Sequence, residues 1–377
     1  MNLAIISPAS NAYSETFIQA HKRIKADKIF FYYGGYMPTH VEGQGLINIS
    51  KEINDFKTII QLSKKINIFD VFARKLSLRE TLLAHSFRKN KIDVVLAEYG
   101  PSAVECLNVC KKLRIPLITH FHGFDVAYVE EKFSKRYKDV FDYSSSIIAV
   151  SKEMVNDLNA LGASQDKLVY SPCGPNELFF SAEPHFKNKN LLFVGRLVDK
   201  KAPYYLIQVM RNLKETFPDV SLNIVGEGPL LNTCINLTKA LGLTDKINFK
   251  KRQSPLEIKN LINDSFLYIQ HSVTTLEGDK EGTPVGIMEA SAASLPVVAS
   301  SHAGIKDVII DGQTGLLSPE HDIETMTENI ISLLNNPEKA KKMGMEGRKR
   351  IKENFSLDKH LDILSRAVEK AFLNRLV

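Results

Sequence analysis

The sequence predicts an α/β protein of two domains, each built around a parallel sheet. Its 377 residues exceed the length of one typical domain, which is about 100–200 residues. Short apolar runs alternate with helical patterns from the first residues onward, and the same alternation restarts at Leu191. We therefore expect one domain over residues 1–180 and another over 181–356, with 357–377 packing back on the first.

The composition indicates a soluble globular protein of a reducing compartment. Hydrophobic residues make up 44% of the chain and charged residues 24%, which is ordinary for such proteins. No apolar run reaches the length of about eighteen residues that a membrane-spanning helix needs. The first residues lack the basic region of a signal peptide, and the four cysteines form no Cys-x-x-Cys pair and are expected to be buried thiols. Together these features predict a cytoplasmic location.

Basic residues are concentrated in one segment, residues 57–91. Nine Lys or Arg stand there against Asp70 and Glu80, a local charge of +7 in a chain whose net charge is +6. Its apolar residues recur near helical spacing, so we expect a basic amphipathic helix. Two interpretations stay open: a solvated surface, or peripheral docking on the anionic inner face of the plasma membrane. No stacking aromatics or RNA-binding module accompany the charge, so nucleic acid is not an expected partner.

The first domain begins with a strand, a loop and a helix, as Rossmann-like domains do. The first strand is expected at 3–7, and Asn11 and Ser14 in the loop after it are candidates for contact with a ligand. Further strands are expected at 28–33, 93–97, 116–119, 146–150 and 167–170.

Two histidines stand at the end of the strand at 116–119. His120 and His122 are separated by one residue at the strand end, and we expect their side chains to point to opposite faces. No third ligand lies nearby in the sequence, and we therefore expect no metal site. Ligands of open parallel sheets bind beyond such strand ends, which makes His122 and the following Asp125 candidate ligand contacts.

The second domain repeats the pattern, with strands expected at 191–194, 222–225, 245–250, 266–270 and 297–299. The turn after its first strand carries Gly195 and two cations, Arg196 and Lys201, which suit a diphosphate because Arg can bind it bidentately and Lys as a point charge. The turn at Gly226 is not a dinucleotide fingerprint, because Leu231 stands where the third glycine of GxGxxG belongs.

The most informative stretch is 277–299, a loop, a helix and a buried strand. Thr283 is the expected N-cap of the helix, and Pro284 its first residue. Glu281 and Glu289 are eight residues apart, roughly 12 Å if all are helical. A surface loop before an ordinary helix explains this spacing, and so does a ligand with hydroxyls at both ends and a diphosphate between them. Free N–H groups that favour a phosphate are expected at Gly282, Thr283, Val285 and Gly286.

The run EGTPVGIMEA followed by LPVVAS resembles the donor-binding motif of the retaining glycosyltransferases of family 4. The extra GDKEG before the helix is most similar to the bacterial exopolysaccharide branch, which includes colanic-acid-type enzymes. GRL with a following Lys201, the GEGP turn and the HGFD run resemble further segments of the same family. Ala202 and Cys173 depart from the pattern, since the family usually has Gly and Asn there.

The resemblance implies the GT-B fold: two Rossmann-like parallel-sheet domains facing an interdomain cleft, with a C-terminal helix that crosses back to the first domain. It also implies the roles of individual residues. Glu289 would bind the ribose, Glu281 and His122 the donor sugar, and Arg252 would lie beside the base. Gly195, Gly226 and the start of the helix at Gly282, Thr283 and Val285 would complete the donor site, with Arg196 and Lys201 at the diphosphate. Acceptor-side contacts would come from Asn11, Ser14 and Asp125.

The expected activity is therefore transfer of a sugar from a nucleoside-diphosphate sugar to a hydroxyl of a glycan, such as a lipid-linked oligosaccharide in exopolysaccharide, O-antigen or capsule synthesis. No obligatory cofactor or metal is expected, because Arg196 and Lys201 can supply the positive charge at the diphosphate. Two alternatives stay open: a nucleotide-sugar epimerase of the same architecture, and a non-catalytic, membrane-associated assembly protein.

Overall fold

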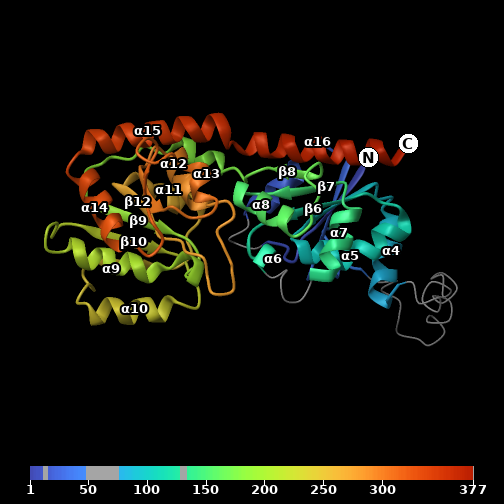
Figure 1. Ribbon diagram of the computed structural model, residues 1–377, viewed down its shortest axis with the longest axis horizontal. Coiled ribbons are helices and arrows are strands. Elements are labelled where there is room, and N and C mark those ends of the chain that lie inside the picture. The colour runs from blue at the N-terminus through green and yellow to red at the C-terminus, as the bar shows by residue number, and fades with distance from the viewer. Residues whose placement is uncertain (12–15, 48–75, 128–133, 377) are drawn as a thin grey trace. The chain divides into compact units, whose positions relative to one another are not determined.

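The computed structural model describes residues 1–11, 16–47, 76–127 and 134–376 (Figure 1). The chain divides into two compact units. Unit 1 comprises Met1–Ala149, Val155–Ser171 and Leu361–Val377, and unit 2 comprises Val150–Met154 and Pro172–His360. The basic segment predicted at 57–91 lies outside the described residues up to residue 75, and its remainder contains a helix, α4 (Leu78–Lys89).

Unit 1 contains an eight-stranded sheet in the order β4-β3-β2-β1-β5-β6-β7-β8. All neighbouring strands pair in parallel except at the β2–β3 and β3–β4 pairs, which are antiparallel. The strands are β1 (Asn2–Ile6), β2 (Lys28–Tyr33), β3 (His40–Val41), β4 (Gly45–Leu46), β5 (Val94–Glu98), β6 (Leu117–Phe121), β7 (Ser146–Ala149) and β8 (Leu168–Tyr170). The near-continuous apolar runs of β1, β5 and β6 are fully buried, as strands covered on both faces require.

The helices that include unit 1 residues are α1 (Thr16–Ala20), η1 (His21–Arg23), α4, α5 (Gly100–Leu113), α6 (Phe124–Ala127), α7 (Ser134–Tyr143), α8 (Lys152–Ala160) and α16 (Leu357–Leu376). Helix α4 begins with a capping box, in which the Ser77 hydroxyl accepts from the Glu80 N–H and the Glu80 carboxylate accepts from the Ser77 N–H. Cys106 and Cys110 on α5 are buried free thiols, as predicted.

Unit 2 contains a six-stranded parallel sheet in the order β11-β10-β9-β12-β13-β14. This is the Rossmann strand order. The chain adds strands in one direction from β9 to β11 and in the other direction from β12 to β14, and ligands of such sheets bind beyond the strand ends at the point between β9 and β12. The strands are β9 (Asn190–Val194), β10 (Ser221–Val225), β11 (Ile247–Lys250), β12 (Leu267–Gln270), β13 (Val297–Ser300) and β14 (Leu316–Ser318).

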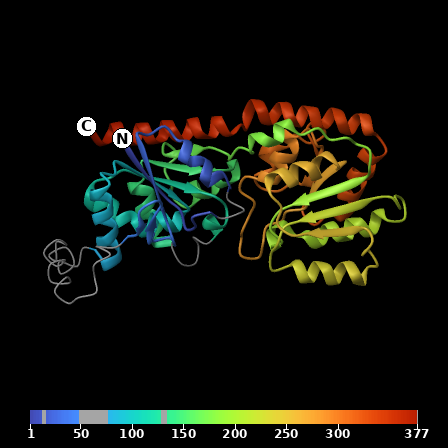
Figure 2. The ribbon, with the colours of Figure 1, turned by 180° about the vertical axis from the view of Figure 1, so that it is seen from behind.

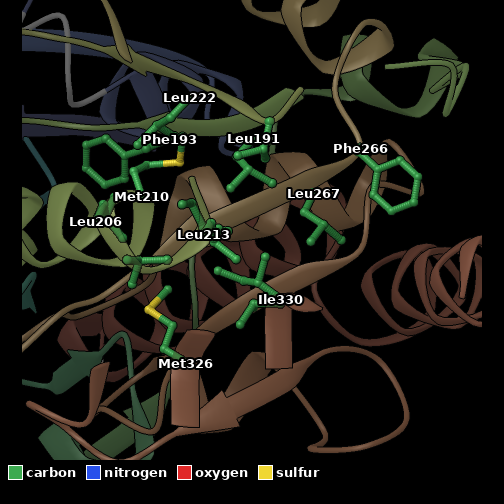
Figure 3. Packing of buried hydrophobic residues seen from close by; sticks show 14 of the residues in the cluster. Leu191, Phe193, Leu206, Met210, Leu213, Leu222, Phe266, Leu267, Met326 and Ile330 are labelled. Carbon is green, nitrogen blue, oxygen red and sulfur yellow. The ribbon is translucent and has the colours of Figure 1, made fainter. Parts of the chain in front are cut away.

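Helices cover both faces of the unit 2 sheet, as Figure 2 shows for its yellow-green strands. Alternate residues of β9 enter different cores: Leu191 and Phe193 pack with Met210 of α9 (Pro203–Leu213) on one face (Figure 3), and Leu192 packs with Ile287 of α12 (Val285–Ala292) on the other. The helical elements are η3 (Glu177–Ser181), η4 (Asp199–Lys201), α9 (Pro203–Leu213), α10 (Leu231–Ala240), α11 (Pro255–Asn263), α12 (Val285–Ala292), α13 (Ile305–Val308), α14 (Ile323–Leu334) and α15 (Pro337–Asn354).

The fold agrees with the predicted class: two α/β units, each with a largely parallel sheet. The units divide near residue 172, earlier than the boundary at 180 drawn from the sequence. Residues 172–180 group with unit 2 because Phe179 of η3 is buried in the core beside α11 and α12. The short antiparallel strands β3 and β4 were not predicted.

Candidate active site

A buried ion pair lies beyond the carboxyl end of β9. Lys201 closes η4, and its Nζ is 2.7 Å from Oε2 of Glu281, which precedes α12. The two side chains are only 12% and 8% exposed. Burial lowers the pKa of Lys201, with Glu281 opposing this shift. Burial alone would raise the pKa of Glu281, but the charges of Lys201 and Lys200 bring it below its usual range. Glu281 is therefore ionised near pH 7.

Two further cations surround this pair, and they differ in their partners. The charges of Lys200 and Arg196 help to lower the pKa of Lys201, which places all three cations in one electrostatic neighbourhood. Lys200 is balanced by Asp279, whose Oδ1 lies 3.0 Å from the ammonium. Arg196 is exposed and has no ion-pair partner within the described part of the chain. Its guanidinium is thus available to an anion.

The glycine turns beyond β9 and β10 pack backbone against backbone. Gly226 has φ of 136°, and a Cβ there would lie 2.0 Å from the Gly195 carbonyl oxygen. Only glycine fits this approach. Next to the turn, Arg252 Nε lies 3.0 Å from Glu227 Oε2, with the arginine side chain 61% exposed. Gly195, Gly226 and Arg252 therefore border one surface at the ends of neighbouring strands.

The start of α12 differs from the prediction. Pro284, with ψ of 77°, is the N-cap, and no side chain caps the helix. The Thr283 side chain bonds to other segments instead: its hydroxyl donates to the Val150 carbonyl and accepts from the Cys173 N–H. The Val285 N–H donates to the Thr283 carbonyl at 3.0 Å, so it is not one of the free donors that the sequence predicted. The Thr283 hydroxyl is engaged by Val150 and Cys173, which explains why it does not cap the helix.

Glu289 lies in the second turn of α12 and is half-buried. Its carboxylate has no hydrogen-bond or ion-pair partner among the residues that the structure describes. Burial raises its pKa to about 8. The same helix approaches β12 closely, because a Cβ on Gly286 would lie 2.4 Å from the Tyr268 hydroxyl. An unpartnered carboxyl group at this position suits a ligand that brings hydroxyl donors.

A second group of predicted residues lies in unit 1, after β6. His122 Nε2 lies 2.7 Å from Oε2 of Glu98, the last residue of β5. Asp125 is fully buried, and its two oxygens accept the backbone N–H groups of Gly100, His122 and Gly123. Asp125 therefore fixes the loop that carries His122, and both of its oxygens are engaged in doing so.

The expectation that His120 and His122 point to opposite faces is wrong. Residues two positions apart in an extended chain lie on the same face, so His122, which follows the end of β6 at Phe121, stays on the side of His120. The two imidazole centroids are 4.1 Å apart, and both rings face Glu98. Asn11 is exposed in the loop after β1, and Ser14 lies outside the described residues.

A cavity of about 380 Å³ also belongs to unit 1. It lies beyond the carboxyl end of β2, and Tyr36, Met37, Arg79 and Glu105 are among the residues that line it. Glu105 is paired with Arg136 at 3.5 Å, whereas Arg79 is exposed and has no ion-pair partner within the described ranges. Aromatic, apolar and charged groups around one cavity suit a polar ligand with a hydrophobic face.

Family models match most of the chain. Residues 176–350 match the model Glycosyl transferases group 1, and residues 55–176 match Glycosyltransferase Family 4. The chain belongs to the GT-B glycosyltransferases. Anabaena HepE in complex with UDP has a TM-score of 0.77 to this glycosyltransferase at 14% identity, covering 98% of this chain and 100% of that chain. At this identity the likeness establishes the shared fold.

Two relatives of this glycosyltransferase are named for the synthesis of exopolysaccharides. It is 28% identical over 249 residues to the putative colanic acid biosynthesis glycosyltransferase WcaL of Escherichia coli K12, covering 64% of this chain and 61% of that protein. It is 27% identical over 274 residues to the amylovoran biosynthesis glycosyltransferase AmsK of Erwinia amylovora, covering 70% and 67%. The chain thus spans about three-fifths of the length of WcaL.

Several site residues of the glycosyltransferase were not predicted from its sequence. His302 Nε2 accepts the Glu281 N–H at 3.0 Å, and its Nδ1 lies 2.6 Å from Glu320 Oε1, so His302 holds the backbone of Glu281. Glu98 and His21 are likewise new. Among the described residues, no helix is both long and apolar enough to cross a membrane.

Proposed function

We propose that this protein transfers a glycosyl group from a nucleoside-diphosphate sugar to a hydroxyl of a glycan acceptor in bacterial exopolysaccharide synthesis. The observation that carries the proposal is the buried Lys201–Glu281 pair beside the exposed Arg196, at the point where ligands of a Rossmann sheet bind. The relationship to WcaL and AmsK supports a glycan acceptor.

The donor's diphosphate would bind to the cations beyond β9. As the bond between the sugar and the diphosphate breaks, negative charge grows on the leaving phosphate oxygen. Lys201 and Arg196 oppose that charge, so they stabilise the transition state more than the ground state. Glu281 holds the Lys201 ammonium in place through its 2.7 Å contact, and its other oxygen would accept from a hydroxyl of the donor sugar.

The nucleoside end of the donor would lie toward α12. Glu289 accepts hydrogen bonds from the ribose hydroxyls in this arrangement, which gives its carboxyl group the partners that it lacks among the described residues. Gly282 and Thr283 precede the helix, where backbone N–H groups favour a phosphate. Arg252 lies beside the base.

The acceptor would bind to unit 1. The cavity lined by Tyr36 and Arg79 suits a saccharide, because an aromatic face packs against a sugar ring and charged groups meet its hydroxyls or an acidic substituent. Attack by the acceptor oxygen on the anomeric carbon forms the new bond, the bond to the diphosphate breaks, and the acceptor proton passes to the leaving phosphate oxygen. A retained anomeric configuration follows from the family 4 resemblance.

The test is a turnover assay with UDP-glucose, UDP-galactose and GDP-mannose, and with lipid-linked glycans from an exopolysaccharide-producing strain as acceptors. Release of nucleoside diphosphate together with a new glycosidic linkage in the NMR spectrum supports transfer. A changed donor sugar without acceptor indicates an epimerase, and no turnover with any pair contradicts the proposal. Lys201→Ala should lower turnover about 10²–10³-fold, by analogy with the loss of one oxyanion donor.

A further inference from the structure

The loop over residues 271–284 carries Glu281, and one carboxylate of unit 2 holds this loop near both of its ends. Glu320 lies in the turn after β14, and its Oε2 accepts the Thr274 N–H at 2.8 Å. Its Oε1 lies 2.6 Å from Nδ1 of His302, and Nε2 of the same ring accepts the Glu281 N–H at 3.0 Å. Glu320 therefore bonds to the start of the loop directly and to its end through His302.

The end of the loop packs closely on the turn that carries His302. This turn follows β13, and His302 is only 1% exposed. The Gly304 N–H donates to the Glu281 carbonyl at 3.3 Å, so both backbone polar groups of Glu281 bond to the same turn. A Cβ on Gly304 would lie 1.7 Å from the Gly282 carbonyl oxygen, so only glycine allows this approach of the two backbones. The position of Glu281 is thus set by the end of a sheet strand.

These contacts permit only one tautomer of His302. Burial alone would raise the pKa of Glu320, but its hydrogen bonds with His302 and Thr274 bring the pKa below its usual range, so the carboxylate can only accept. The backbone N–H of Glu281 can only donate. His302 must therefore carry its proton on Nδ1 and leave Nε2 bare. In the opposite tautomer two N–H groups would face each other at Glu281, and two acceptors would face each other at Glu320.

Glu281 in turn contacts the cation that the donor's diphosphate would meet. Its Oε2 lies 2.7 Å from Lys201 Nζ, and both side chains are nearly buried. We propose that Glu320 is a positioning residue: by fixing the tautomer of His302 it holds Glu281 in the place from which Glu281 orients Lys201 toward the diphosphate. This inference rests on the proposed function, and it assigns to Glu320 and His302 a role that requires no contact with the ligand.

The two ends of the loop differ in how much they depend on Glu320. At the start of the loop the Val273 N–H donates to the Lys200 carbonyl at 2.9 Å, which anchors that end independently. At the other end the Glu281 N–H is buried, and its acceptor is His302. An apolar side chain in place of His302 would leave this N–H unsatisfied, which is costly for a buried donor. Glu320 should therefore affect the donor site through His302.

The direct test is the tautomer of His302 in the wild-type protein without ligand. Long-range ¹H–¹⁵N spectra of protein with labelled histidine detect its ten histidines, and His302→Gln assigns the resonance of interest. We expect Nδ1 to carry the proton and Nε2 to be bare at neutral pH. A proton on Nε2, or averaging between the two tautomers, overturns the proposal. Because the spectrum is that of the wild type, it decides the tautomer even where a variant does not fold.

Nucleotide affinity supplies the second readout, by calorimetric titration of the full chain with UDP, GDP and ADP. We expect Glu320→Ala to weaken binding about 3- to 10-fold, which corresponds to the loss of one hydrogen bond. In His302→Gln the amide oxygen can accept the Glu281 N–H with no tautomer to fix, so this variant should bind nearly as the wild type does. Adding Glu320→Ala to His302→Gln should then change the affinity less than about 2-fold. An equal loss in both backgrounds would mean that Glu320 acts through Thr274 alone, and would overturn the proposal.

Two further variants complete the experiment. His302→Leu removes the acceptor and should weaken nucleotide binding as Glu320→Ala does. The control, Glu328→Ala on the exposed side of α14, should bind as the wild type does. Wild-type affinity in both Glu320→Ala and His302→Leu contradicts the positioning role. A wild-type protein that shows the predicted tautomer but binds none of the three nucleotides contradicts the proposed function instead.

Discussion

Lys201 and Glu281 form a nearly dry ion pair, 2.7 Å apart, between the turn after β9 and the loop before α12. The sequence predicted that both residues bind the donor, but it gave each a separate part of the ligand. Their contact changes that interpretation. The carboxylate orients the ammonium and balances its charge, so the cation can stay charged where burial lowers its pKa. The pair thus prepares a binding site for an anion before the ligand arrives.

The pair should be coupled in stability. Removing one partner leaves the other as a buried unpaired charge, which costs about 3–5 kcal/mol of stability. Removing both side chains leaves no unpaired charge, so this cost does not arise in the double variant. We therefore expect Lys201→Ala/Glu281→Ala to be less destabilised than the sum of the single variants by more than about 1 kcal/mol in urea unfolding. The exposed pair Lys189–Asp219, 3.0 Å apart, is the matched control and should show coupling of about 0–1 kcal/mol. Additivity of the Lys201 and Glu281 variants would count against the buried pair.

Glu289 should make stability depend on pH. Burial raises the pKa of its carboxyl in the folded protein to about 8 from an ordinary value of 4.5. The folded state therefore binds this proton more tightly, and the resulting stabilisation is complete below pH 4.5 and is lost as the pH rises through 8. Relative to Glu289→Gln, the free energy of unfolding of the wild type should fall between about pH 5 and pH 9. Parallel curves would contradict the raised pKa. Glu328 is exposed on α14, so the free energy of unfolding of Glu328→Gln should depend on pH as that of the wild type does.

Gly286 should be required by the close packing of α12 on β12. A Cβ at this position would lie 2.4 Å from the Tyr268 hydroxyl and 3.0 Å from the Val194 carbonyl oxygen. Gly286→Ala should cost about 1–3 kcal/mol of stability, as overpacking does. The same change should cost less in a Tyr268→Phe background, because the nearest atom is gone. Gly347→Ala in α15, whose nearest neighbour would be 3.4 Å away, should be neutral or stabilising by up to about 1 kcal/mol. A Gly286→Ala variant as stable as wild type would refute the close contact.

Most of the fold could be predicted because its strands are short apolar runs that end in turns. Strand β2 spans the predicted residues 28–33, and β9 and β10 lie within one residue of theirs. Strands β3 and β4 have two residues each, too few to produce a periodic pattern. Ala202 shows what a departure from the family pattern means physically. It has φ of 37°, in the left-handed region, where the glycine usual at this position fits without strain.

The donor-side residues could be predicted because they cluster in continuous motifs. The cluster of Glu98, His120 and His122 could not, because it depends on pairing between strands. In the sequence, nothing distinguishes Glu98 from any other residue at the end of a strand. Only the register of β5 against β6 brings it beside His120. The cap of α12 was mispredicted for a similar reason: Thr283 is bonded to Val150 and Cys173, both more than a hundred residues away.

The central claim is that Lys201 and Arg196 hold a diphosphate in unit 2, and calorimetric titration of the full chain with UDP, GDP and ADP tests it most directly. We expect at least one of the three to bind the wild type. Lys201→Ala and Arg196→Ala should each weaken that binding at least about 10-fold, since a hydrogen bond to a charged group contributes about 1.5–3 kcal/mol. Lys239→Ala, exposed on α10, should bind as the wild type does. Unchanged affinity in both cation variants, or no binding of any of the three nucleotides, would contradict the account.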